Sequence, residues 1–303
     1  MSVALRNTRD IEGPDLAATS MLCTLRSRLA VGRLGQLWNR PSIIRKAHNM
    51  LSRFIRHLVV DREGALAHRL ACLEASNRCL QIALDGMLVS PKYVAADDVG
   101  FNGQARRKQI FNEILAVAPL DAIVETGTCL GDTTGYMALT SELPVHTCDL
   151  NPRFHALAKL RLSDIDQVNL NLTDSRCFLR ERARGPLADR FLLFYLDAHW
   201  YDDLPLSQEL DIIAAEWTQF IVMVDDFQVP DDPGYGYDNY GVDKALTLDL
   251  LRPSIAQHDL AVFFPSCTAV QETGARRGCV ILTKHGELAE RLASVSSLRR
   301  WAV

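Results

Sequence analysis

Two kinds of segment alternate from about residue 104 onward. One kind is short and apolar, as in DAIVETG and FLLFYLDAH, and has the length and residue types of a buried strand. The other kind is longer and amphipathic, as in PRFHALAKLRLSD and SQELDIIAAEW, and has the apolar spacing of a helix. Strands that alternate with helices predict a parallel sheet with helices on both faces.

The last two predicted strands are LAVFFPS and RRGCVILT, which lie too close together in the sequence for a helical crossover. Parallel neighbours need a long connection, whereas antiparallel neighbours do not. We therefore expect a mostly parallel sheet that has an antiparallel pair at one edge.

Acidic residues end five successive predicted strands. They are Glu125, Asp149, Asp174, Asp197 and the pair Asp225 and Asp226. Ligands of open parallel sheets bind beyond the carboxyl ends of the strands. These carboxylates are therefore expected to share one rim of the sheet, where solvent and ligands reach them.

A glycine-containing loop follows the first of these strands, in IVETGTCLGDTTGYMA. Gly127 and Gly131 are spaced to let the loop bend tightly and a ligand lie against its backbone. The dinucleotide pattern GxGxxG is absent because Cys129 stands where its second glycine would be, and no GK[ST] follows. Glu125 would repel a phosphate, so the loop suits a cationic ligand better.

Three carboxylates are expected to converge at the ends of the fourth and fifth of these strands. Asp197 ends one strand, and Asp225 and Asp226 end the other. Neighbouring parallel strands lie about 4.8 Å apart, and carboxylates this close repel one another unless a cation lies among them. Oxygen ligands favour Mg²⁺, Mn²⁺ or Ca²⁺ over zinc.

The segment ETGTCLG resembles the first motif of class I S-adenosylmethionine-dependent methyltransferases, (D/E)xGxxxG, and the resemblance covers roughly residues 100–285. It implies a Rossmann-like, seven-stranded, mostly parallel sheet with an antiparallel last strand, and S-adenosylmethionine as cofactor. It also implies that Asp149 holds the ribose hydroxyls and that Asp174 and Ser175 meet the adenine. The other expected cofactor-binding residues are Glu125, Gly127, Thr128 and Gly131.

LDAHW and VDDF resemble segments of metal-dependent O-methyltransferases of the macrocin and catechol types. By this resemblance Asp197, Asp225 and Asp226 are metal ligands. Relative to the catechol enzyme, Ala198 is inserted and Tyr201 replaces a lysine, so the catalytic lysine of that enzyme has no counterpart here. Cephalosporin-hydroxylase-like proteins share much of this pattern.

The predicted activity is methylation of a hydroxyl on a small molecule or glycan. A metal lowers the pKa of the hydroxyl, and transfer depends on positioning beside the sulfonium methyl. Asp197 and His199 are the expected catalytic residues, His199 being either the general base or a histidine that hydrogen-bonds to a metal ligand. The alternatives are a metal-dependent hydroxylase-like relative on the same scaffold and a non-catalytic binding protein with the cofactor fold.

An α-helical N-terminal extension is predicted over residues 1–95, with its first 40 residues poorly ordered or loosely helical, before a methyltransferase domain over 96–303. Residues 16–60 include basic but no acidic side chains. A basic helical face of this kind binds a membrane surface, a polyanion or a partner subunit, as in a homodimer, or is simply solvated.

Overall composition sets further expectations. The formal net charge of -4 argues against a nucleic-acid-binding protein. No stretch approaches the roughly 20 apolar residues of a membrane span, and the first residues lack the apolar core of a secretory signal. None of the 8 cysteines forms a CxxC pair, which favours reduced thiols in a cytoplasmic protein over a zinc site.

Overall fold

The computed structural model of the protein describes residues 100–199, 203–241 and 244–302, together with residues 69, 70, 73, 76 and 77, which are helical. The chain divides into two units, Met1–Leu84 and Asp85–Val303. The predictions made for the basic residues of the extension, and for a domain boundary at residues 95 and 96, lie outside the described residues.

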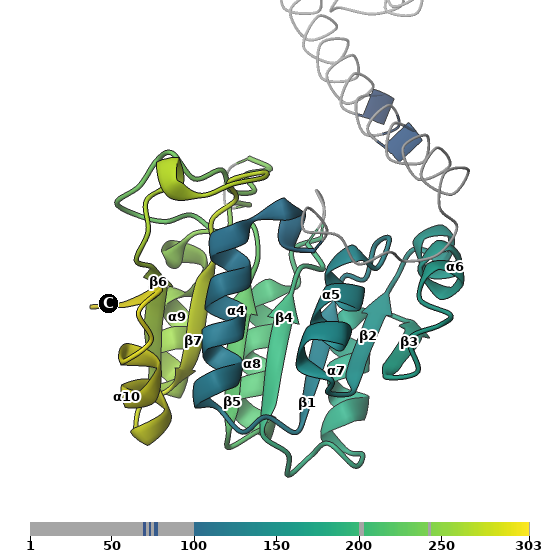
Figure 1. Ribbon diagram of the computed structural model, residues 1–303, viewed down its shortest axis with the longest axis horizontal. Coiled ribbons are helices and arrows are strands. Elements are labelled where there is room, and N and C mark those ends of the chain that lie inside the picture. The colour runs from purple at the N-terminus through teal and green to yellow at the C-terminus, as the bar shows by residue number, and fades with distance from the viewer. Residues whose placement is uncertain are drawn as a thin grey trace, which may run out of the picture. The chain divides into compact units, whose positions relative to one another are not determined.

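One sheet runs through the described part of the chain, with its strands in the order β3-β2-β1-β4-β5-β7-β6-β8 (Figure 1). The strands are β1 Ala122–Thr126, β2 Val145–Asp149, β3 Val168–Leu172, β4 Leu192–Leu196, β5 Phe220–Val224, β6 Leu260–Pro265, β7 Val280–Lys284 and β8 Leu298–Trp301. Strands β1 to β5 pair with one another in parallel, whereas β7 is antiparallel to both β5 and β6. The predicted Rossmann-like, mostly parallel sheet is therefore confirmed.

The predicted antiparallel pair is present as β6 and β7, with β7 lying between β5 and β6. The arrangement differs from the prediction in one way, since an eighth strand, β8, pairs with β6 at the edge. β7 can lie inside because its apolar residues are covered on both faces. β8 has the sequence LRRW. Its two arginines interrupt the apolar pattern by which a strand is predicted, but charged residues are typical of a strand at a protected sheet edge.

Two helical layers cover the sheet (Figure 1). The helices are α4 Ala105–Val117, α5 Asp132–Ser141, α6 Pro152–Arg161, α7 Ser175–Ala183, α8 Leu206–Glu216, α9 Leu248–His258 and α10 Glu287–Ala293. Buried side chains of α4, α5, α6 and α10 share one hydrophobic core, and those of α7, α8 and α9 share the other. No helix in the described ranges combines the length and apolar character needed to cross a membrane.

The period of two along each strand decides which core a side chain enters. In β4, Leu193 and Tyr195 face the core of α4, whereas Phe194 and Leu196 face the core of α8. All five residues of β4 are buried, which explains why the strand is a continuous apolar run. Tyr195 is consequently directed toward α4 at the carboxyl end of the sheet.

Candidate active site

The loop after β1 needs glycine at two positions. Gly127 has φ 90, and a Cβ there would lie 2.3 Å from the backbone oxygen of Asp197. Gly131 has φ 80, and a Cβ there would lie 2.6 Å from Cδ1 of Leu162. Both the left-handed backbone and these close approaches exclude larger residues. The sequence prediction of a tightly bent loop is confirmed.

Asp149 lies at the end of β2, directly beside this loop. Its carboxylate accepts hydrogen bonds from the backbone N–H of Cys129, at 2.8 Å, and of Asn151, at 2.7 Å. Burial raises the pKa of Asp149, while the two backbone bonds act in the opposite direction. The structure thus brings together the loop and the acid that the sequence predicted as ribose ligand.

Glu125 lies under the loop and is only 1% exposed. Its Oε2 accepts hydrogen bonds from the hydroxyls of Thr134 in α5 and Thr147 in β2. Burial raises the pKa of Glu125 to about 7. Glu125 therefore links the start of α5, just after the loop, to β2, and its contact with a cofactor stays a prediction.

The remaining predicted cofactor residues have local partners. The hydroxyl of Thr128 lies 2.6 Å from that of Thr147. Asp174 caps α7 by accepting from the backbone N–H of Arg176, at 2.9 Å, and it also forms an ion pair with the Arg176 guanidinium at 2.5 Å. This hydrogen-bonded ion pair lowers the pKa of Asp174. Ser175 is buried at the start of α7, and its contact with adenine stays a prediction.

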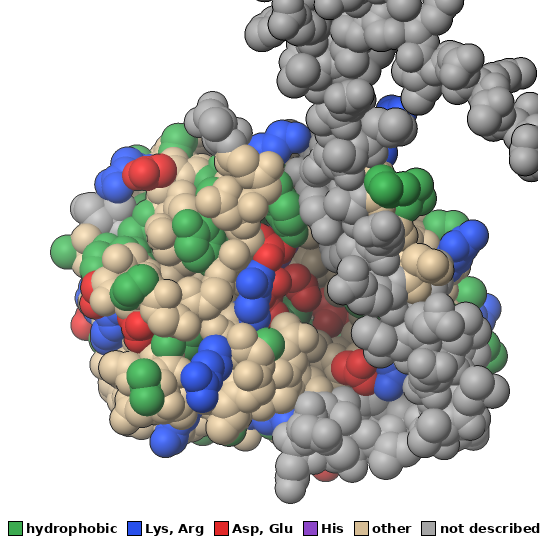
Figure 2. Space-filling view, turned by 90° about the horizontal axis from the view of Figure 1, so that it is seen from above, with side chains coloured by type: hydrophobic (Ala, Val, Ile, Leu, Met, Phe, Trp, Pro, Cys, Tyr) green, Lys and Arg blue, Asp and Glu red, His purple; other side chains and the backbone are tan. Residues whose placement is uncertain are grey.

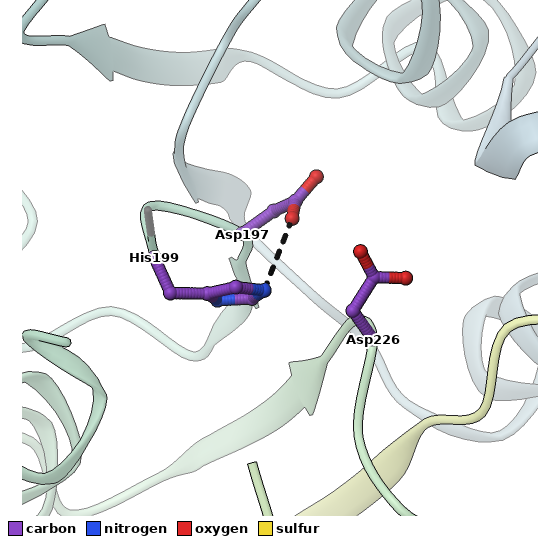
Figure 3. A group of neighbouring side chains, drawn as sticks. All are labelled: Asp197, His199 and Asp226. Carbon is purple, nitrogen blue, oxygen red and sulfur yellow. Dashed lines mark ion pairs between the residues drawn. The ribbon is translucent and has the colours of Figure 1, made fainter. Parts of the chain in front are cut away.

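Acidic side chains gather in a hollow of the surface (Figure 2). Asp197 and His199 follow β4 and Asp226 follows β5, and one ligand atom from each of the three lies within 4.8 Å of the others (Figure 3). We refer to Asp197, His199 and Asp226 as the acid group. Desolvation by the protein and the charges of neighbouring carboxylates raise the pKa of Asp197, and raise that of Asp226 to about 6. A bound cation would relieve this repulsion.

His199 is buried within the acid group. Its Nε2 lies 3.6 Å from Oδ1 of Asp197 and 3.6 Å from Oδ2 of Asp238. This nitrogen has no hydrogen-bond partner among the residues that the structure describes. Burial lowers the pKa of His199, although the carboxylates of Asp238 and Asp225 act against this. A neutral imidazole with an available lone pair fits a metal site.

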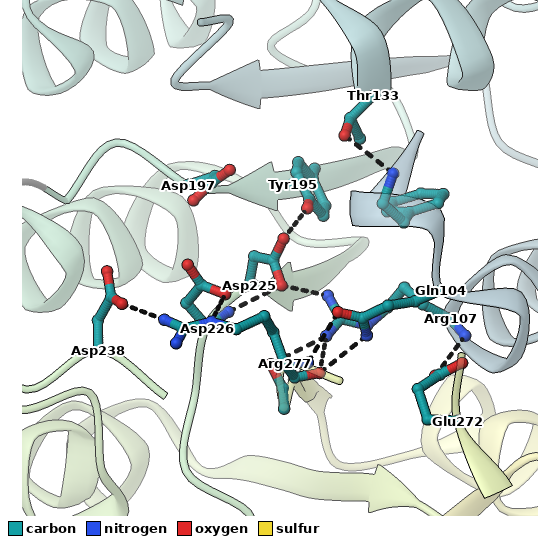
Figure 4. A network of polar contacts seen from close by, with 12 residues as sticks. Gln104, Arg107, Thr133, Tyr195, Asp197, Asp225, Asp226, Asp238, Glu272 and Arg277 are labelled. Atoms are coloured by element: carbon teal, nitrogen blue, oxygen red, sulfur yellow. Dashed lines mark hydrogen bonds and ion pairs between the residues drawn. The ribbon is translucent and has the colours of Figure 1, made fainter. Parts of the chain in front are cut away.

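The carboxylate of Asp225 is directed toward Arg107 and Tyr195 rather than toward the acid group (Figure 4). This arrangement differs from the predicted role of Asp225 as a metal ligand. Its carboxylate accepts from the guanidinium of Arg107 in α4 and from the hydroxyl of Tyr195. Burial acts to raise the pKa of Asp225, but Arg107 and Tyr195 hold it below its usual value. Arg107, itself only 2% exposed, also donates to the carbonyls of Arg277, at 2.7 Å, and Gly278, at 2.9 Å.

Three residues of this site were missed by sequence reasoning. They are Arg107, Asp238 and Arg277. Arg277 donates through Nε to Oδ1 of Asp226 at 2.6 Å and also forms an ion pair with Asp238 (Figure 4). Asp238 belongs to the long connection between β5 and α9, and the backbone N–H of Asp238 donates to the carbonyl of Asp226 at 2.9 Å. In the sequence, only the unusual length of the connection between β5 and α9 indicates that this segment contributes to the site.

No family model matches the chain, and no curated protein matches it. Solved structures to which it is similar include an O-methyltransferase from Bacillus cereus in complex with SAH, at 12% identity and a TM-score of 0.46. Another is the O-methyltransferase TomG from Streptomyces achromogenes, involved in tomaymycin synthesis and bound to SAM, at 15% identity and a TM-score of 0.46. Each comparison covers 69% of this chain and 90% of the other. The residues of the site, rather than these similarities, carry the functional inference.

Proposed function

We propose that the chain is an S-adenosylmethionine-dependent O-methyltransferase, assisted by a divalent metal, that methylates a hydroxyl of a small molecule or glycan. One observation carries the proposal: the glycine loop and the acid group touch. A Cβ on Gly127 would lie 2.3 Å from the backbone oxygen of Asp197, and the backbone N–H of Asp197 donates to the carbonyl of Thr126 at 2.9 Å. A cofactor that lies on the loop would have its reactive end beside the acid group.

The cofactor side of the proposal rests on Asp149 and the loop. Each carboxylate oxygen of Asp149 accepts one backbone N–H, and a carboxylate has about four lone-pair sites in all. The remaining sites would accept the ribose hydroxyls. Gly127 and Gly131 allow the tight loop on which the cofactor would lie, since larger residues would collide with Asp197 and Leu162. Asp174 and Ser175 lie at the start of α7, where adenine is expected.

The reaction side of the proposal rests on the acid group. Asp197 and Asp226 would hold a divalent cation, since their ligand atoms converge. Neighbouring carboxylates help to raise the pKa of both residues, and a cation between them would relieve that repulsion. Bound there, such an ion supplies the Lewis acidity that lowers the pKa of a coordinated hydroxyl. Asp197 continues directly from β4, so the strand fixes its carboxylate relative to the glycine loop. Methyl transfer depends on this fixed positioning.

The test is calorimetric titration of S-adenosylhomocysteine into wild type, Asp149→Ala and Asp189→Ala, with Mn²⁺, with Mg²⁺ and with chelator. Asp189 is an exposed acid before β4 and serves as the matched control. Losing charge-assisted hydrogen bonds from Asp149 should weaken binding about ten-fold or more, and the control should bind as wild type does.

Turnover is then measured with S-adenosylmethionine and a panel of hydroxylated acceptors, with and without metal. Methylation that chelator abolishes supports the full proposal. Failure to bind S-adenosylhomocysteine under every condition would refute the methyltransferase proposal.

A further inference from the structure

The imidazole of His199 is buried, and the part of the chain that the structure describes does not satisfy its hydrogen-bonding capacity. The residue is 4% exposed, and its Nε2 has no hydrogen-bond partner within the described ranges. The 3.6 Å separations from Asp197 and Asp238 exceed the usual length of an N–H···O hydrogen bond. A buried nitrogen that faces two carboxylates without bonding to either needs another partner.

A cation shared with the carboxylates is a partner that fits. Ligand atoms that bind one ion at about 2.1 Å lie about 3 to 3.5 Å from one another. The observed 3.6 Å between Nε2 and Oδ1 of Asp197 would therefore require only a small contraction. Figure 3 shows the imidazole ring turned toward the gap between Asp197 and Asp226.

Asp226 can take part while it keeps its ion pair. Arg277 donates to one oxygen of Asp226, Oδ1, at 2.6 Å, and a carboxylate has a second oxygen and further lone pairs. Carboxylates that bind metals are commonly held in this way by a hydrogen bond from a neighbouring residue.

We infer, on the basis of the proposed metal-assisted function, that His199 is a metal ligand and that the acid group selects a first-row transition ion such as Mn²⁺, Fe²⁺ or Co²⁺ over Mg²⁺ and Ca²⁺. Mg²⁺ and Ca²⁺ bind oxygen ligands, whereas imidazole nitrogen favours transition ions. Two carboxylates and one imidazole form a mixed donor set. The sequence had instead predicted an all-oxygen set from Asp197, Asp225 and Asp226, which suits Mg²⁺, Mn²⁺ or Ca²⁺.

The competing arrangement is an ion pair in which a protonated His199 lies between Asp197 and Asp238. The experiment must therefore detect nitrogen bound to the metal, and not metal binding alone. Electron paramagnetic resonance of Mn²⁺ does this, because pulsed spectra show hyperfine coupling to a coordinated nitrogen. Competition with Mg²⁺ then gives the ratio of the two affinities.

Three forms of the full chain are compared after treatment with chelator: wild type, His199→Asn and His258→Asn. His258 ends α9 and pairs with Asp211 at 3.3 Å, so the control removes another histidine–aspartate pair. Binding of S-adenosylhomocysteine, measured by calorimetry, reports in each form whether the fold and the cofactor site are intact.

We expect wild type and His258→Asn to bind Mn²⁺ with nitrogen coupling. His199→Asn should lose the coupling, and its preference for Mn²⁺ over Mg²⁺ should fall about ten-fold or more. Mn²⁺ binding without nitrogen coupling in wild type, or an unchanged preference in His199→Asn, overturns the inference. So does a wild type that binds S-adenosylhomocysteine but no Mn²⁺. If Mn²⁺ binds through nitrogen and S-adenosylhomocysteine does not bind, the methyltransferase proposal fails and the metal ligand stands.

Discussion

Replacing Glu125 by glutamine should make the protein more stable at pH 8, although it removes a charged residue from the predicted cofactor motif. Glu125 is buried between β1, α5 and β2, and burial raises its pKa from 4.5 to about 7. Between these two pH values the native state holds a proton that the unfolded state has released. The stability of wild type therefore falls as pH rises through this window.

The magnitude follows from the two pKa values. A tenfold change in proton affinity corresponds to about 1.4 kcal/mol, so the difference between 4.5 and about 7 amounts to about 3 kcal/mol once Glu125 is ionised. Glutamine has the shape of a protonated glutamate and does not ionise. Glu125→Gln should therefore exceed wild type in unfolding free energy by a margin that is small at pH 5 and approaches about 3 kcal/mol at pH 8.

Urea unfolding at several pH values measures this margin, with the buried Trp217 as fluorescent reporter. Glu113→Gln is a control of opposite sign. Despite partial burial, hydrogen bonds from Gln109 and Ser297 lower the pKa of Glu113, so this variant should lose stability at pH 8 and recover as pH falls. A margin for Glu125→Gln that stays constant with pH would show that Glu125 is ionised in the native protein, and would refute the reasoning.

Three further substitutions separate buried from exposed interactions. Arg107→Met should cost about 3 to 5 kcal/mol in urea unfolding because it leaves the charge of Asp225 buried and unpaired; a cost under about 1 kcal/mol would contradict this. Arg291→Ala breaks an exposed pair with Glu287 and should change stability by less than about 0.5 kcal/mol in the same assay. Gly127→Ala should cost about 2 kcal/mol or more and weaken binding of S-adenosylhomocysteine in calorimetry, since its Cβ would meet backbone; wild-type binding would contradict the described loop.

The parallel sheet could be predicted because its strands are buried on both faces. LLFYL and FIVMV, which form β4 and β5, have every residue buried and therefore read as continuous apolar runs. β8 gave no such signal, because an edge strand of four residues that contains two arginines has no apolar pattern. The missed strand also explains why the predicted sheet ended one strand early.

The glycine loop and Asp149 could be predicted because they lie within about 20 residues of each other. The ion pair between Asp225 and Arg107 could not be predicted, because 118 positions of the sequence separate the two residues. The alternation of side chains between the two faces of β5 nevertheless explains why Asp225 meets Arg107. Met223 faces the core of α4, so Asp225, two positions later, turns to the same side, toward Tyr195 and Arg107.

Asp226, with φ 52, leaves the strand direction at this point. Its carboxylate then joins Asp197 and His199. The sequence placed both acids at the right end of the sheet, but the choice between them depended on backbone direction and on a distant arginine.

The charges at the carboxyl ends of β4 and β5 indicate which kind of ion the site would accept. Among the residues that the structure describes, the charged side chains gathered there are Asp197, Asp225, Asp226, Asp238, Arg107 and Arg277. With His199 neutral, four carboxylates and two guanidiniums leave a charge of −2. Arg107 compensates Asp225 and Arg277 is shared by two acids, so the uncompensated charge falls on the acid group, where the pKa values of Asp197 and Asp226 are raised. One divalent cation neutralises this remainder, whereas without the two arginines the same four acids would retain a charge of −2 after the ion had bound.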